Sequence, residues 1–329
     1  MRARSVPRLI LVDGFAGSGK STTAQRLCLL LRAAGRRAEW FHEHQAAHPI
    51  FCYDEVEELL AVAPDAFEDQ ILARWSAFAR SGSGDAAAIR ILEGSFLQLT
   101  VGVMLSMNLT SARIVRVLRE IDRLLAPLDP ALIHLFHRDV RAGLLAIRDH
   151  RGAYWLEGMT TIVGRSAYGR RHGVRDVEGL IGFYRKQQAI IEAALPKLTL
   201  RRLGIEIGRG AWGAYATRMS AFLAMDRRNI AATAHDLRRC PGSYRSRIGS
   251  GRMVTTDGAA LYLHETLQPA QRLLPAGAGR FWVESLPIEL RFTHEQRGRF
   301  GRFAVDNRLM NARPAAASFT RIEERPPSR

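Results

Sequence analysis

Residues 14–21 have the types and the spacing that bind phosphate. They read Gly-Phe-Ala-Gly-Ser-Gly-Lys-Ser, which matches the pattern G-x-x-x-x-G-K-[ST]. Glycines let the backbone wrap around a phosphate so that several N–H groups point at it, and a helix starting near Lys20 adds the positive end of its dipole. Lys20 can reach the β- and γ-phosphates, and the Ser21 hydroxyl can bind Mg²⁺. The pattern therefore predicts binding of a nucleoside triphosphate.

The surroundings of this segment favour the same prediction. The apolar run 9–12 precedes it and the helically spaced segment 22–27 follows it, whereas a glycine-rich turn that matches by chance needs neither. Phe15 occupies a variable position of the pattern, and we expect no chemistry from it. The residues predicted to bind the nucleotide at this loop are Gly14, Phe15, Ala16, Gly17, Ser18, Gly19, Lys20, Ser21 and Thr22.

Two carboxylates stand at the ends of strand-like runs. Glu43 ends the second such run and Glu93 ends the third. Because ligands of parallel sheets bind beyond the carboxyl ends of the strands, both are candidate site residues. Phosphoryl transfer needs a metal ion and often a carboxylate that accepts the proton of the acceptor. We expect Glu93 to hold Mg²⁺ together with Ser21, or to position the acceptor, and Glu43 to act as the base. The alternative is that either carboxylate caps a helix or pairs with an arginine.

Arginines concentrate in later stretches of the chain. Arg148 lies in the helical pattern after the fourth strand-like run, and we expect it to contact the nucleotide. The segment 164–173 is rich in glycine and arginine and precedes a long helical pattern. As a mobile loop it could bring Arg170 or Arg171 over the phosphates and stabilise charge in the transition state. The alternative for each arginine is a solvated surface position.

Three histidines, His42, His44 and His48, form a local cluster. Their spacing matches no strong metal motif. Three interpretations of these histidines are possible: they bind zinc, they line the acceptor pocket, or they are ordinary loop residues.

Composition limits the class of protein. A chain of 329 residues can hold more than one domain. The net charge of +16 resembles that of nucleic-acid-binding proteins, but only three of the 48 basic residues are lysines, so a general arginine bias explains the charge as well. We therefore expect a small-molecule acceptor and no nucleic acid as partner. Three cysteines without metal spacing and no membrane-length apolar run predict a soluble, cytoplasmic protein.

Strand-like and helical segments alternate over residues 1–225. This alternation predicts an α/β domain with a mainly parallel sheet and helices on both faces. Strands are expected at 9–12, 37–41, 88–92, 131–136 and 198–207. Helices are expected at 21–34, 54–60, 67–79, 114–125, 140–149 and 177–195.

The pattern changes after about residue 225. Short segments rich in β-formers lie between turn signals and predict a small antiparallel β domain over 226–322, with 323–329 as a disordered tail. Its strands are expected at 252–256, 260–263, 280–283 and 288–292.

Residues 1–225 resemble a P-loop nucleotide or nucleoside kinase of the thymidylate-kinase-like kind. The resemblance is carried by segment 13–24, by Glu43, by Glu93-Gly94 and by the arginine-rich stretch before 177–195. It implies that Glu43 contacts the acceptor, that Glu93 lies near metal and acceptor, and that Arg170 and Arg171 belong to a lid. The chain departs from the family in two places. It has no Asp-Arg-Tyr or Glu-Arg-Ser tripeptide after the third strand, and His44 replaces the proline of the usual Glu-Pro.

The C-terminal segment is similar to small β accessory domains appended to some serine hydrolases. The similarity is carried by 242–244, 257–263, 272–275 and 289–292. Such domains resemble a half-barrel and usually lack catalytic residues, so an interface or covering role is implied.

These features favour an ATP- and Mg²⁺-dependent phosphotransferase. Its acceptor would be a nucleoside, a nucleotide or another hydroxylated compound. The alternatives are a nucleotide-dependent ATPase or switch that acts through a protein partner, and a kinase that acts on nucleic-acid ends. The sequence is also compatible with a homodimer.

Overall fold

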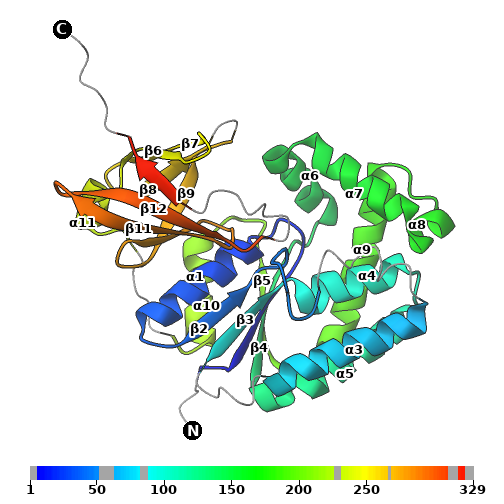
Figure 1. Cartoon of the computed structure of the whole chain (residues 1–329). Coiled ribbons are helices and arrows are strands. Elements are labelled where there is room, and N and C mark those ends of the chain that lie inside the picture. Colours follow the sequence, from blue (N-terminus) through cyan, green and yellow to red (C-terminus); the bar gives the residue numbers. More distant parts are fainter. Residues whose placement is uncertain are drawn as a thin grey trace. The chain divides into compact units, whose positions relative to one another are not determined.

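The chain divides into two compact units. The computed structural model describes residues 6–51, 63–81, 88–225, 231–265, 268–309 and 318–322 (Figure 1). The first unit comprises Met1–Ala24, Gly35–Glu43 and Ala47–Arg227, and the second comprises Gln25–Ala34, His44–Ala46 and Arg228–Arg329. The helix expected at 54–60 and the tail expected at 323–329 lie outside the described residues.

The first unit is built on a five-stranded sheet in the order β2-β3-β1-β4-β5. Every neighbouring pair is parallel, which confirms the predicted α/β class. All residues of β1 and β3 are buried, and this explains why apolar residues dominate both strands, although Arg90 lies within β3. The strands are β1 (Leu9–Gly14), β2 (Ala38–Phe41), β3 (Ile89–Glu93), β4 (Pro130–Phe136) and β5 (Arg201–Glu206).

Helices cover both faces of this sheet. Helix α10 lies on one face, and α4, α5 and α9 lie on the other (Figure 1). The helices expected in the described residues are present with shifted ends: α1 (Lys20–Ala33), α3 (Pro64–Ser81), α5 (Ser111–Leu125), α6 (Val140–Arg151) and α9 (Val177–Ala194). Further elements that the sequence did not predict are η2 (Ser95–Leu99), α4 (Thr100–Ser106), η3 (Ala126–Leu128), α7 (Ala153–Arg165), α8 (Ala167–His172), η4 (Leu195–Lys197) and α10 (Trp212–Phe222).

The segment 164–173 is helical, so the expectation of a loop there is wrong. It contains the end of α7 and the whole of α8, and Ser166 caps α8 by accepting a hydrogen bond from the Gly169 amide. A Cβ atom at Gly169 would lie 1.9 Å from the Val163 carbonyl oxygen. The glycine therefore permits a tight turn between two helices instead of marking a mobile loop.

The second unit contains a closed eight-stranded barrel. Its strand order is β10-β11-β12-β13-β6-β7-β8-β9, and every pair is antiparallel. The antiparallel β prediction is confirmed, and the sheet is closed where the resemblance implied a half-barrel. Its elements are α11 (Ala234–Arg239), β6 (Gly242–Ser246), β7 (Gly251–Thr256), β8 (Leu261–His264), β9 (Gln271–Gly277), β10 (Arg280–Val283), β11 (Ile288–Gln296), β12 (Arg299–Asn307) and β13 (Ser318–Arg321).

Aromatic rings fill the interior of the barrel. The ring centroids of Phe303 and Phe319 lie 5.0 Å apart in a stacked arrangement, and Tyr244 meets Phe303 edge-on at 4.8 Å. Phe281 and Phe292 complete the aromatic part of this core. Side chains of this size occupy the space that wider barrels leave for a ligand.

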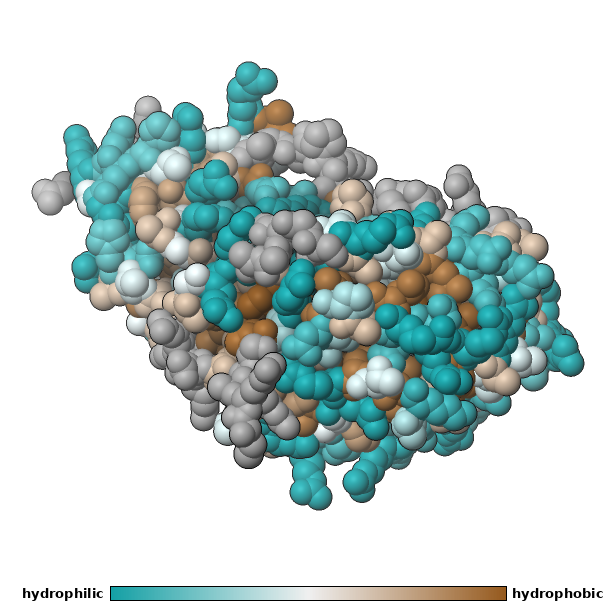
Figure 2. All heavy atoms as spheres, turned by 90° about the horizontal axis from the view of Figure 1, so that it is seen from below, coloured by the Kyte–Doolittle hydropathy of each residue, from teal (hydrophilic) through white to brown (hydrophobic). Residues whose placement is uncertain are grey.

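Polar side chains cover most of the face of the molecule drawn in Figure 2, with hydrophobic residues in separate patches between them. No helix within the described ranges is long and apolar enough to cross a membrane.

Arg321 joins the last barrel strand to the segment that leads into the first. Its guanidinium lies 4.9 Å from the centre of the Tyr244 ring. It donates hydrogen bonds to Phe300 O (2.7 Å), Pro241 O (2.8 Å), Arg239 O (2.9 Å) and Tyr244 Oη (2.8 Å). One side chain thus donates to a carbonyl group of β12 and to two carbonyl groups of the segment before β6, near the place where β13 pairs with β6.

We predict that Arg321→Met destabilises the barrel by about 2–4 kcal/mol, because partly buried carbonyl groups lose a charged donor. Urea denaturation of the full chain, followed by circular dichroism, measures this change. Arg245→Met, at an exposed position of β6, is the matched control. Equal free energies of unfolding for Arg321→Met and Arg245→Met would contradict the role of Arg321.

Candidate active site

The loop between β1 and α1 depends on its glycines. Gly14, Gly17 and Gly19 have positive φ values of 136°, 66° and 78°. A Cβ atom at Gly14 would lie 1.9 Å from the Leu135 carbonyl oxygen on β4, and one at Gly19 would lie 2.6 Å from the Trp212 ring. Close neighbours, as well as backbone conformation, therefore require glycine at these positions.

Lys20 and Ser21 meet Glu93 in the first turn of α1. The Lys20 ammonium donates a hydrogen bond to the Phe15 carbonyl oxygen at 3.1 Å, which keeps it over the loop. The Ser21 hydroxyl donates to Glu93 Oε1, and the Trp40 indole donates to Glu93 Oε2 at 2.9 Å. Three residues that the sequence assigned to the site, Lys20, Ser21 and Glu93, therefore lie together.

Glu93 is fully buried, and its environment disfavours its charge. Burial raises the pKa of Glu93 to about 8, and the nearby Glu43 carboxylate adds to the effect. The hydrogen bonds from Ser21 and Trp40 and the charge of Lys20 act in the opposite direction. The carboxyl group therefore holds a proton at neutral pH unless another cation is bound beside it.

The Glu43 carboxylate adjoins Lys20. A Cβ atom at Gly94, where φ is 65°, would lie 2.5 Å from Glu43 Oε2 and 3.5 Å from Lys20 Cε. The Gln98 amide donates a hydrogen bond to the same Glu43 oxygen at 3.2 Å. Both carboxylates that the sequence singled out are thus close to the loop lysine.

Asp13 is not among the residues that the sequence predicts for the site, yet it organises it. Its buried carboxylate accepts hydrogen bonds at 2.7–2.8 Å from the amides of Gly14, Phe96, Leu97 and Gln98. It therefore joins the end of β1 to the start of η2 and sets the position of Gln98. The only sequence signal is its place directly before the first loop glycine.

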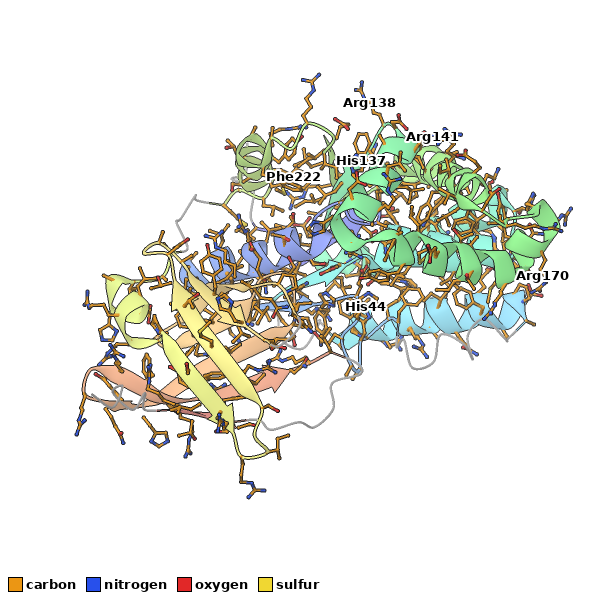
Figure 3. The ribbon with its side chains drawn as sticks, turned by 90° about the horizontal axis from the view of Figure 1, so that it is seen from above. His44, His137, Arg138, Arg141, Arg170 and Phe222 are labelled. Carbon is orange, nitrogen blue, oxygen red and sulfur yellow. The ribbon has the colours of Figure 1, made fainter. Side chains whose placement is uncertain are left out.

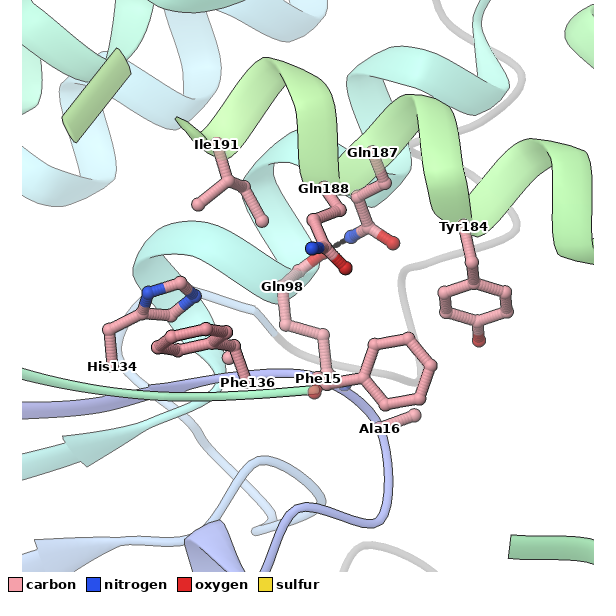
Figure 4. Close-up of a pocket in the computed structure, with 10 residues that line it drawn as sticks. Phe15, Ala16, Gln98, His134, Phe136, Tyr184, Gln187, Gln188 and Ile191 are labelled. Atoms are coloured by element: carbon pink, nitrogen blue, oxygen red, sulfur yellow. Dashed lines mark hydrogen bonds between the residues drawn. The ribbon is translucent and has the colours of Figure 1, made fainter. Parts of the chain in front are cut away.

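A pocket lies beside the glycine-rich loop 14–21 (Figure 4). Residues of the loop, η2, β4 and α9 line it: Gly14, Phe15, Ala16, Gln98, His134, Phe136, Tyr184, Gln187, Gln188 and Ile191. None of them is a lysine, arginine, aspartate or glutamate, and burial lowers the pKa of His134 to about 4. The pocket wall is therefore uncharged.

Phe15 contributes the loop's own wall of this pocket. Its ring centroid lies 5.4 Å from that of Tyr184 and 5.6 Å from that of His137. The pKa of Tyr184 is raised, mainly by burial and then by the charge of Glu43. Phe15, which the sequence predicts only as part of the nucleotide-binding loop, therefore also forms a wall of this pocket.

His48 anchors the loop after β2. Its Nδ1 accepts hydrogen bonds from the amides of Ile50 (3.1 Å) and Phe51 (3.0 Å), so the ring hydrogen is on Nε2, which faces Ser95 Oγ at 3.3 Å. Burial lowers the pKa of His48 to about 4, and the positive charge of His42 adds to this. In the described ranges, no three His, Cys, Asp or Glu side chains converge as metal ligands would.

The predicted arginines do not gather at the loop. Arg170 donates to the Arg165 carbonyl on the exposed side of α8, and Figure 3 draws it far along the helical region from His137, the neighbour of Phe15. Arg171 is also exposed on α8. Arg148 is exposed on α6 and pairs with Asp149 at 2.9 Å.

The parallel five-stranded sheet, with the loop after its first strand, fits a P-loop kinase-like fold. No protein-family model matches the sequence, and no curated protein matches it. Among solved structures, a thymidylate kinase from Candida albicans is similar at 16% identity and a TM-score of 0.36, over 69% of this chain and 98% of that chain. Similarity at this level carries no conclusion about function, which must come from the geometry of the site.

The raised pKa of Glu93 predicts a pH-dependent stability. Because the folded protein holds a proton that the unfolded chain releases near pH 4.5, stability falls as pH rises towards 8. Between about pH 6.5 and 8, we expect wild type to lose about 1–2 kcal/mol relative to Glu93→Gln. Urea denaturation in EDTA measures this difference. The control is Glu157→Gln at an exposed position of α7. The prediction is refuted if the free energy of unfolding changes with pH in the wild type by the same amount as in Glu93→Gln.

Proposed function

We propose that this protein is an ATP- and Mg²⁺-dependent phosphotransferase that transfers the γ-phosphoryl group to a hydroxyl of a small molecule. The observation that carries the proposal is the meeting of Lys20 and Ser21, at the end of a phosphate-binding loop, with the carboxylates of Glu43 and Glu93. The chain has no Asn-Lys-x-Asp motif for reading guanine, which favours ATP as the donor.

The residues present fit a magnesium ion. Ser21 and Glu93 offer the oxygen ligands that Mg²⁺ prefers, and they are already hydrogen-bonded to each other. Glu93 is buried with a raised pKa, so a divalent cation at this place would offset an unfavourable charge. When bound, the ion would neutralise negative charge on the β- and γ-phosphates.

The remaining steps need only residues of the site. The loop amides and Lys20 hold the triphosphate. The acceptor oxygen attacks the γ-phosphorus, the bond from this phosphorus to the oxygen that bridges to the β-phosphorus breaks, and ADP leaves. The hydroxyl proton passes to the Glu43 carboxylate, which accepts a hydrogen bond from the pocket residue Gln98 and lies, like Lys20, next to Gly94.

The pocket favours transfer to an acceptor over a hydrolytic switch. An uncharged wall of aromatic rings and amides beside loop 14–21 suits contact with an organic acceptor. A lid function of Arg170 or Arg171 would need movement of α8 and is not part of the proposal.

Lys20→Ala is expected to weaken ATP binding by about 30- to 150-fold, because charged hydrogen bonds to the phosphates are lost. Titration with a fluorescent ATP analogue measures this loss. Lys197→Ala, which removes an exposed lysine in η4, is the control. The proposal is contradicted if the wild-type protein binds neither ATP nor GTP.

Glu43→Gln tests the base. We expect it to bind ATP as wild type does and to lower the turnover number by about 10²–10⁴-fold, as removal of a general base does. Release of ADP in the presence of an acceptor library measures turnover. Unchanged turnover would exclude Glu43 from proton transfer.

A further inference from the structure

We propose that the acceptor is a neutral, hydroxyl-bearing ring compound without a phosphate group, bound in the pocket between Phe15 and α9. This inference rests on the proposed function and specifies its substrate class. It excludes nucleotides, which are one of the acceptor classes that the loop pattern leaves open.

The charges around the transfer point argue against an anionic acceptor. Glu43 and Glu93 both adjoin Lys20, and the Lys20 charge is used by the triphosphate once the donor is bound. A phosphomonoester on the acceptor would bring about 1.5–2 further negative charges towards Glu43. Repulsion between like charges, in a partly buried site, would disfavour such an acceptor.

Among the described residues that line the pocket, none supplies a cation to balance an acceptor phosphate. Its ten lining residues include neither lysine nor arginine. Arg151 acts on the pKa of Tyr184 from the end of α6, but it is exposed, and its guanidinium lies 6.0 Å from the centre of the Trp155 ring. Specific phosphate sites instead place arginine or lysine in direct contact with the anion.

The chemistry of the wall suits a neutral ring. Phe15, Phe136 and Tyr184 supply aromatic surfaces, while Gln98, Gln187 and Gln188 supply amides (Figure 4). Few polar groups among apolar ones are typical of sites that orient small neutral molecules.

Gln98 links this wall to the base. The Gln98 side-chain nitrogen donates a hydrogen bond to the Glu43 carboxylate. A carboxylate can only accept hydrogen bonds, so the NH2 end of the Gln98 amide faces it and the amide oxygen points away from it. That oxygen is buried and accepts no hydrogen bond from any residue that the structure describes, so a ligand would reach it only after a rotation of the Gln98 side chain or of the wall around it. A buried acceptor of this kind favours a ligand N–H or O–H as its partner. The same amide would therefore orient the acceptor and hold Glu43 beside its hydroxyl.

Matched pairs of acceptors test the inference. The probes are ribo- and deoxyribonucleosides and hexoses, each compared with its own phosphomonoester, with ATP labelled in the γ-phosphate. We expect kcat/KM for the neutral member to exceed that of its phosphomonoester by about tenfold or more. Preference for the phosphomonoesters would overturn the inference. ATP binding is measured separately, by comparison with Lys20→Ala. Preference for phosphomonoesters would therefore contradict only the neutral acceptor, whereas absence of ATP binding would contradict the proposed phosphotransferase activity as well.

A charge introduced into the pocket provides a second test. Gln188→Arg places a cation on the wall and is expected to shift the ratio of kcat/KM towards phosphomonoesters by about tenfold. Gln70→Arg, at an exposed position of α3, is the matched control. A general loss of structure would lower both members of a pair alike, so the ratio separates a structural effect from a charge effect. A ratio that is the same in Gln188→Arg and Gln70→Arg would contradict the placement of the acceptor.

Discussion

The charge balance around Lys20 is the constraint on which the site depends. Glu93 is buried next to Glu43, and hydrogen bonds from Ser21 and Trp40 offset only part of the unfavourable energy of its charge. A site in this condition gains from a bound cation and loses from an added anion. The proposed position of Mg²⁺ and the proposed neutrality of the acceptor both follow from this balance.

The parallel sheet holds these groups together. β2, β3 and β1 are neighbours, so Trp40, Glu93 and Asp13 come from carboxyl ends that share one edge. Asp13 then joins β1 to η2 and thereby positions Gln98 against Glu43. The precision of the site therefore depends on strand register and on a buried carboxylate more than on long loops.

Local signals explain which elements could be predicted. β1 and β3 are buried throughout and are mostly apolar in sequence, which made them predictable. β9 contains Pro275 and Gly277, which are rare in strands, and it was not predicted. The segment 164–173 was misread because glycine and arginine are typical of loops, although Gly169 in fact allows two helices to meet closely. Closure of the barrel between β13 and β6 joins segments that are distant in sequence, and no local pattern encodes such a pairing.

The sequence by itself determined the glycine-rich loop between the first strand and helix, the alternation of strands and helices, and the two carboxylates that follow strands, because each depends on residue types at short spacing. Only the tertiary structure decided which side chains share the site. It brought Glu43 and Glu93 to Lys20, set Phe15 and Gln98 in the wall of a pocket, and left Arg170 on an exposed helix. The reason is physical, since contacts between distant residues depend on strand order and helix packing, which are properties of the whole folded chain.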